Sequence, residues 1–230
     1  MKKQTILTGY LLILGAFTFW LSWLLMPDPG TTDTNHILNI VKQSRESVLY
    51  SVIIQITSAV LYAAALFLLV KVSFPQKRTL TGVIVLGIGA MGLCADAFFH
   101  LLAWFMTDDS VTIQEDVIRV MEFMQTDALI FLVPLLLPFF IGSLVLGIGL
   151  HKQGITSAIP KWIFLATLVI GPVGALLSKT IFDYNGPVLT LTSLGIFSLG
   201  HVFIGFELIM GAGKAKNNLT TIDLRILRSK

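Results

Sequence analysis

Long uninterrupted apolar runs constrain the fold of this chain more than any other feature of its sequence. A helix of about 20 apolar residues crosses a bilayer core about 30 Å thick. Within lipid, only helices and closed barrels satisfy all of their backbone polar groups. Charged residues make up 13% of the chain, against about 25% in soluble domains. The sequence therefore predicts an all-α, polytopic membrane protein and excludes a soluble globular fold.

The breaks between the apolar runs predict six transmembrane helices. Prolines and glycines end the runs, as at Pro27-Asp28-Pro29-Gly30, because neither residue continues a helix well. The predicted spans are about 5–26, 48–70, 80–106, 125–150, 159–181 and 187–213, and a polar, basic tail follows at 214–230.

Lysines and arginines are distributed unequally between the two ends of the predicted bundle. Of the 16 in the chain, all but Lys42, Arg45, Arg119 and Lys179 lie in the terminal segments and in the loops at the same end. Loops rich in these residues stay in the cytoplasm. The distribution predicts that the N- and C-termini are both cytoplasmic, with the tail at 214–230 on that side.

Two polar segments at the opposite end carry apolar residues at helical spacing. These residues are Ile37, Ile40 and Val41 in the first segment, and Ile113, Val117, Met121 and Met124 in the second. Helices of this kind lie in the plane of the membrane interface. We therefore expect two short amphipathic helices on the outer face, where together they would cap the bundle.

Ionisable residues interrupt the apolar runs. Asp96 and His100 lie one helical turn apart on one face of the third span. From the helical rise, Asp96 is about 15 Å, His100 about 9 Å and His201 about 21 Å from the outer end of its span. Intramembrane ionisable residues usually face the protein interior and mark functional sites. We predict an outward-facing polar pocket formed by Asp96, His100, His201, Gln55, Ser58 and Asp127.

The pairing of Asp96 with His100 admits several roles. A carboxylate beside an imidazole orients the ring and raises its basicity, which serves a metal ligand, a general base or a proton relay. The same pair can also only fix packing through hydrogen bonds to neighbouring spans. With His201, the two residues would offer nitrogen and oxygen ligands to a divalent metal ion. A haem held between His100 and His201 is disfavoured, because their depths differ by about 12 Å.

Three functions from different classes follow from these residues. The chain contains no nucleotide-binding glycine loop, no HExxH and no CxxC, which favours a binding, structural or regulatory membrane protein. The first alternative is a membrane-embedded, metal-dependent lipid hydrolase that uses Asp96, His100 and His201. The second is a small-solute or proton-coupled transporter, for which Pro134 and Pro138 would supply a kinked span.

The junction between the fourth and fifth spans carries a family resemblance. From Gly147 to Trp162 the sequence reads GIGLHKQGITSAIPKW, in which a span ends in leucine, a short basic linker follows, and Ile-Pro-Lys-Trp opens the next span. This junction resembles that of uncharacterised bacterial multi-pass integral membrane proteins of unknown function. The resemblance implies a protein of the bacterial plasma (inner) membrane and implies no activity.

The partners predicted from the sequence are the lipid bilayer and other helices. Nothing in the charge pattern indicates a nucleic-acid partner. Glycines recur on helix faces, at Gly82, Gly87, Gly89 and Gly92 in the third span and at Gly195, Gly200 and Gly205 in the sixth. Small residues let helices approach closely in membranes. These faces predict close contacts within the chain or in a homo-oligomer.

Overall fold

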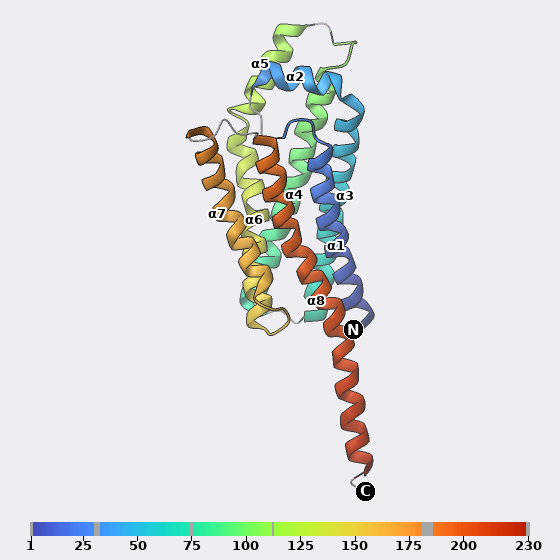
Figure 1. Cartoon of the computed structure of the whole chain (residues 1–230). Helices are drawn as coiled ribbons and strands as arrows, with labels where there is room; N and C mark the ends of the chain where they lie inside the picture. Colours follow the sequence, from blue (N-terminus) through green and yellow to red (C-terminus); the bar gives the residue numbers. More distant parts are fainter. Residues whose placement is uncertain (1, 30–32, 74–75, 112, 181–185, 229–230) are drawn as a thin grey trace.

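The computed structural model describes residues 2–29, 33–73, 76–111, 113–180 and 186–228, and this described part is all-α (Figure 1). Its helices are α1 (Lys2–Leu25), α2 (Thr34–Gln43), α3 (Arg45–Ser73), α4 (Lys77–Met106), α5 (Gln114–Gln125), α6 (Leu129–Lys152), α7 (Ile159–Thr180) and α8 (Gly186–Arg228). Helices α1, α3, α4, α6 and α8 are long and apolar enough to cross a membrane, whereas the apolar stretch counted in α7, Ile159–Ile170, is shorter.

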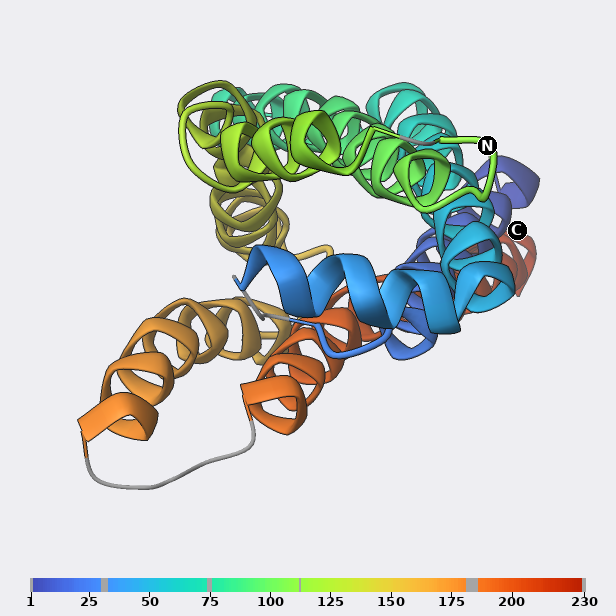
Figure 2. The ribbon, with the colours of Figure 1, turned by 90° about the horizontal axis from the view of Figure 1, so that it is seen from above.

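The six long helices form a ring in which each packs against two neighbours. The order around the ring is α1, α3, α4, α6, α7 and α8, and α8 returns to α1 (Figure 2). The interior contains large buried side chains such as Phe19, Tyr62 and Phe139. The outer faces are also apolar, and Phe67 and Met91 are more than half exposed there. A helix that is apolar on all sides is typical of a membrane span.

Glycines bring neighbouring long helices into backbone contact. A Cβ added to Gly89 of α4 would lie 2.1 Å from the backbone nitrogen of Phe139 in α6. Comparable backbone approaches involve Gly82 and Gly92 with α6, Gly142 with α4, and Gly205 with Gly9 of α1, whereas Gly200 makes room for the ring of Phe164 of α7. Gly87, by contrast, has nothing within 4 Å of such a Cβ. Apart from Gly87, the glycines predicted as contact faces on α4 and α8 thus lie at contacts between helices of the chain.

Two boundaries differ from those predicted. Helix α5 continues to Gln125, and α6 begins at Leu129 rather than at 125. The reason is Thr126, whose backbone angles (φ −123°, ψ −86°) end α5 and turn the chain. At the other end, the segment predicted as a separate tail continues α8 as far as Arg228 (Figure 1). No proline or glycine lies between Lys214 and Arg228 to stop that helix.

Helices α2 and α5 lie at the end of the bundle opposite the two chain termini, and we refer to them together as the cap (Figure 1). Asp33 precedes α2, and its Oδ1 accepts a hydrogen bond of 2.8 Å from the His36 backbone nitrogen. The apolar face of α5, with Met121 and Met124, packs on Ala103 and Met106 of α4, and Ile37 of α2 joins this cluster. Val41 of α2 packs with Met26 and Val48. Burial of these faces holds the cap on the bundle.

Candidate functional site

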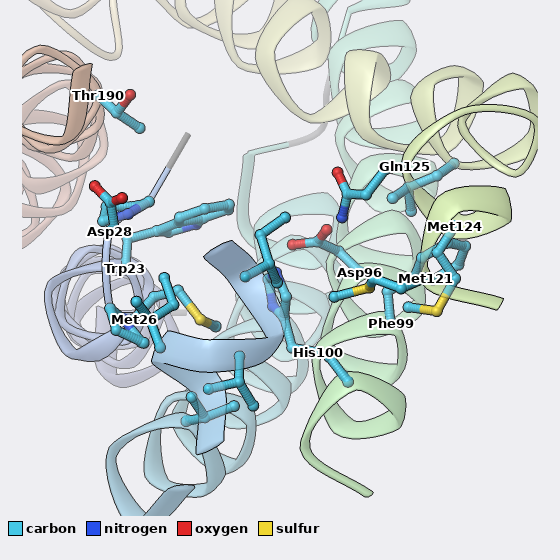
Figure 3. Close-up of a pocket in the computed structure, with 18 of the residues that line it drawn as sticks. Trp23, Met26, Asp28, Asp96, Phe99, His100, Met121, Met124, Gln125 and Thr190 are labelled. Carbon is cyan, nitrogen blue, oxygen red and sulfur yellow. The ribbon is translucent and has the colours of Figure 1, made fainter. Parts of the chain in front are cut away.

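A cavity of about 280 Å³ lies beneath the cap and extends between the long helices (Figure 3). We call it the cap cavity. Its wall is mostly apolar and includes Trp23, Met26, Phe99, Met121, Met124 and Leu132. Its polar lining residues are Asp28, Asp96, His100, Gln125 and Thr190. In the close-up, Asp96 and Gln125 lie on one side, Trp23 and Asp28 on the other, and His100 between them.

Asp96 is the buried acid of this cavity. It lies on the inner face of α4, and only 6% of it is exposed. Its Oδ2 accepts a hydrogen bond of 2.7 Å from the Nε2 of Gln55, which is itself buried on α3. The structure therefore brings together two of the residues predicted for the pocket, with the amide of Gln55 holding the carboxylate of Asp96 at the cavity wall.

His100 lies one turn closer to the cap than Asp96. Its ring meets Trp23 of α1 edge to face, with 5.8 Å between the ring centroids. His100 Nδ1 and Trp23 Nε1 are both buried, and neither has a hydrogen-bond partner among the described residues. An unpaired buried polar atom costs about 1–3 kcal/mol. A ligand in the cavity that bonded to either nitrogen would relieve that cost.

His201 lies apart from the cap cavity. It is fully buried on α8, and its Nε2 is 3.0 Å from Ser143 Oγ of α6. The Ser143 hydroxyl donates to the Phe139 carbonyl oxygen at 2.6 Å, so the imidazole Nε2 carries the proton and donates to Ser143. Aromatic rings surround the imidazole, with centroid distances of 4.8 Å to Phe164 and 4.9 Å to Tyr62. These contacts give His201 a packing role inside the bundle.

The other two residues predicted for the pocket also lie outside the cavity lining. Ser58 is buried on α3, and its hydroxyl donates to the Gly15 carbonyl oxygen of α1 at 2.8 Å. That bond links two helices of the ring. Asp127 is exposed in the turn between α5 and α6. Of the six residues predicted for the pocket, Asp96 and His100 line the cavity, and Gln55 contacts it only through its hydrogen bond to Asp96.

The predicted metal ligands do not converge. Among the described residues, no group of three or more His, Cys, Asp or Glu side chains is placed to hold a metal ion. Asp96 and His100 share the cap cavity, whereas His201 points into the aromatic cluster between α6, α7 and α8. Helices α4 and α8 thus direct these side chains to different parts of the interior.

Several cavity residues were not predicted from the sequence. Asp28 follows the end of α1 with φ at +47°, and its Oδ2 lies 2.6 Å from His36 Nε2 of α2. A positive φ outside glycine is uncommon and is more frequent in aspartate than in most residues. Gln125 is the last residue of α5. The sequence predicted Met121 and Met124 only as part of the apolar face of an amphipathic helix. That apolar pattern was the one sequence feature that pointed to their place in the cavity wall.

Charged groups connect the start of α3 and the cap helix α2 to the end of α4. Arg45 donates from Nη1 to the Trp104 carbonyl oxygen and from Nη2 to Asp108 Oδ2, both at 2.9 Å. Its guanidinium lies 4.6 Å from the centroid of the Trp104 ring. Hydrogen bonds from Ser110, and then the charge of Arg45, hold the pKa of Asp108 below its usual value. Lys42 of α2 lies 3.3 Å from Asp109.

Comparisons with protein-family models, with curated proteins and with solved structures give no match to this chain.

Proposed function

We propose that this protein is an integral membrane protein that binds a small amphiphilic molecule in the cap cavity. The observation that carries the proposal is the cavity itself, with a largely apolar wall and a few polar groups around Asp96 and His100. Ligand sites in proteins have this composition, in which apolar groups supply affinity and a small number of polar groups fix orientation.

The size and lining of the cavity support a small amphiphile. Its volume of about 280 Å³ lies just below the range of about 300–1,000 Å³ found for ligand pockets. That space holds a polar head and a short apolar segment. Met26, Met121 and Met124 contribute thioether side chains to the wall, and unbranched methionine adapts to ligands of different shapes. The site thus suits a class of related molecules.

The membrane arrangement is part of the same proposal. We infer six spans, with α7 as the sixth, in a bacterial plasma membrane, and with the N- and C-termini in the cytoplasm. The cap then lies on the outer face, and the ligand enters from that side. The supports are the five long apolar helices, the position of α7 in the ring and the excess of lysine and arginine at the end that carries the termini.

The two alternative functions have less support from the geometry. A metal-dependent lipid hydrolase using Asp96, His100 and His201 would need these residues around one ion, and the described residues form no group of three such ligands. A transporter would need a continuation of the cavity toward the other end of the bundle. In that direction His201 is enclosed by Tyr62, Phe164 and other aromatic rings.

Amphiphile binding is tested by filling the cavity with a larger side chain and measuring how much the affinity for a fluorescent probe falls. N-phenyl-naphthylamine, a neutral apolar fluorophore, should bind saturably to the protein in lipid nanodiscs. Ala103 lines the cavity on α4, so Ala103→Phe should weaken probe binding by about tenfold, equivalent to about 1.4 kcal/mol. Leu102, its neighbour, is 41% exposed and absent from the cavity lining.

Leu102→Phe serves as the matched control, because it adds a ring to the same turn of α4 without entering the cavity. It should leave probe binding unchanged. Equal binding by the wild-type protein and both variants would show that the probe reports on lipid or on the outer surface, and the proposed function would then lose its support.

A further inference from the structure

We infer that the polar head of the ligand is a protonated amine whose N–H group binds the carboxylate of Asp96. This inference rests on the proposed function, because it assigns a chemical class to the molecule bound in the cap cavity. It starts from the sign of the charges around the cavity and from how each of them is paired.

The charge around the cap cavity is acidic. Its ionisable lining residues are Asp28, Asp96 and His100, and no lysine or arginine is among them. Outside the lining, Arg45 of α3 binds Asp108, Lys42 of α2 lies beside Asp109, and Arg119 of α5 is exposed. An anionic head, such as a carboxylate or a phosphate, would therefore enter a site that holds carboxylates and whose described lining contains no lysine or arginine.

The two acids of the cavity differ in their partners. Asp28 already faces His36, at 2.6 Å. Asp96 is more deeply buried, and the hydrogen bond described for its carboxylate comes from the neutral amide of Gln55. A buried carboxylate is costly unless it is paired with a cation. An ammonium group on the ligand would provide that cation, and its remaining N–H groups would be available to other acceptors in the wall.

The surroundings of Asp96 also favour a cation over a neutral head. Phe99 belongs to the wall of the same cavity, and the faces of aromatic rings attract cations. Gln125 lies on the same side of the cavity as Asp96 (Figure 3), and its side chain has a carbonyl oxygen that can accept a hydrogen bond from an ammonium group. The apolar part of the ligand would then lie against Met121, Met124 and the other apolar residues of the wall.

The experiment compares three amphiphiles that share an eight-carbon chain and differ in the head. Octylamine, octanol and octanoate are measured in radiolabelled form by equilibrium dialysis against the protein in nanodiscs, and empty nanodiscs of the same lipid supply the background. Hydrogen bonds to charged groups are stronger than neutral ones, so octylamine should bind at least about tenfold more tightly than octanol, with octanoate weakest.

Asp96→Asn identifies the group responsible. The substitution removes the charge and nearly keeps the shape, so it should weaken octylamine binding by about tenfold and leave octanol binding within about twofold. Octanol binding thus reports whether the cavity survives the substitution. Asp127→Asn is the matched control, because Asp127 is an exposed carboxylate at the same end of the molecule and lies outside the cavity lining.

The outcomes separate the two proposals. Saturable binding of all three molecules with similar affinity, or an amine preference that persists in Asp96→Asn, contradicts the assignment of an amine and leaves amphiphile binding intact. The comparison of octylamine, octanol and octanoate in the wild-type protein remains valid even if Asp96→Asn does not fold. If none of the three molecules binds saturably, the proposed function is contradicted, and so is the assignment of an amine.

Discussion

Replacing Gly89 by alanine should destabilise the bundle, because α4 and α6 meet at this position without room for a side chain. The new Cβ would lie 2.1 Å from the Phe139 nitrogen and 2.2 Å from its Cα, whereas ordinary contact begins at 3.4 Å. Both atoms belong to the backbone of α6, so the two helices would have to move apart. Overpacking of this kind costs about 1–3 kcal/mol, and the better helix propensity of alanine offsets only about 1 kcal/mol of it.

Gly87 provides a matched control two residues away on the same helix. Nothing lies within 4 Å of a Cβ at that position, so Gly87→Ala should be neutral or stabilising by up to about 1 kcal/mol. The free energies of unfolding are compared by titrating SDS into mixed micelles while helicity is followed by circular dichroism. We expect Gly89→Ala to be about 1–3 kcal/mol less stable than Gly87→Ala.

The same pair of variants tests whether the packing of α4 positions the site. Gly89 lies about two helical turns from Asp96, so separation of α4 from α6 should also weaken N-phenyl-naphthylamine binding. Equal unfolding free energies for the two alanine variants would refute the backbone contact between α4 and α6. Lower stability of Gly89→Ala with unchanged probe binding would refute only the link between that contact and the cavity.

Three further predictions concern the cap and the buried histidine. Arg45→Ala should speed hydrogen exchange of the backbone amides at 104–110 by about fivefold to tenfold, because it removes the bonds to Trp104 and Asp108. Lys42→Ala should have little effect there, since its pair with Asp109 is exposed, and similar acceleration in both variants would contradict the role of Arg45. Because the pKa of Asp108 is lowered on folding, its contribution to the order of this turn should be complete above about pH 4, the usual pKa of aspartate, and be lost as the pH falls through the lowered pKa. Titration of the ¹³C carboxyl signal should show that pKa rising toward the usual value in Ser110→Ala, and no rise would exclude the Ser110 hydroxyl as its main cause. Finally, His201→Ala should lower the free energy of unfolding by about 3 kcal/mol and His201→Phe by less than about 1.5 kcal/mol, as measured by the same SDS titration, because the ring fills space among aromatic side chains. Equal losses in both variants would contradict a role in packing.

The all-α fold could be predicted because helix length and hydropathy are local properties. Each long helix of the described chain overlaps a predicted span, and the glycine faces of α4 and α8 mark real contacts. The start of α6 was predicted too early, at 125 instead of Leu129, because a polar stretch ending in Asp127 interrupts the chain without a proline or glycine to signal the break. The apolar stretch of α7, Ile159–Ile170, is shorter than those of the other five long helices of the described chain.

The candidate site could be predicted only in part. Asp96 and His100 share the cavity because their spacing of four residues fixes them on one face of α4, whatever the rest of the fold. The estimated depths of Asp96 and His201 differ by only about one helical turn. Depth does not determine the rotation of α8 about its axis, however, and that rotation directs the imidazole of His201 to Ser143. Asp28 and Gln125 line the cavity because of where the turn after α1 and the end of α5 are placed. Those placements depend on tertiary packing, so the sequence pattern could not predict them.

The most direct test of the central claim is photo-crosslinking with an alkylamine that carries a diazirine in its chain. The protein in nanodiscs is irradiated with the probe, and the labelled residues are identified by mass spectrometry, with excess octylamine as competitor. Binding in the cap cavity predicts competed labels on residues of its wall, such as Trp23, Met26, Phe99 and Met124. Labels confined to lipid-facing residues such as Phe98 and Phe105, or labels that octylamine does not reduce, would contradict the claim that this cavity is a binding site.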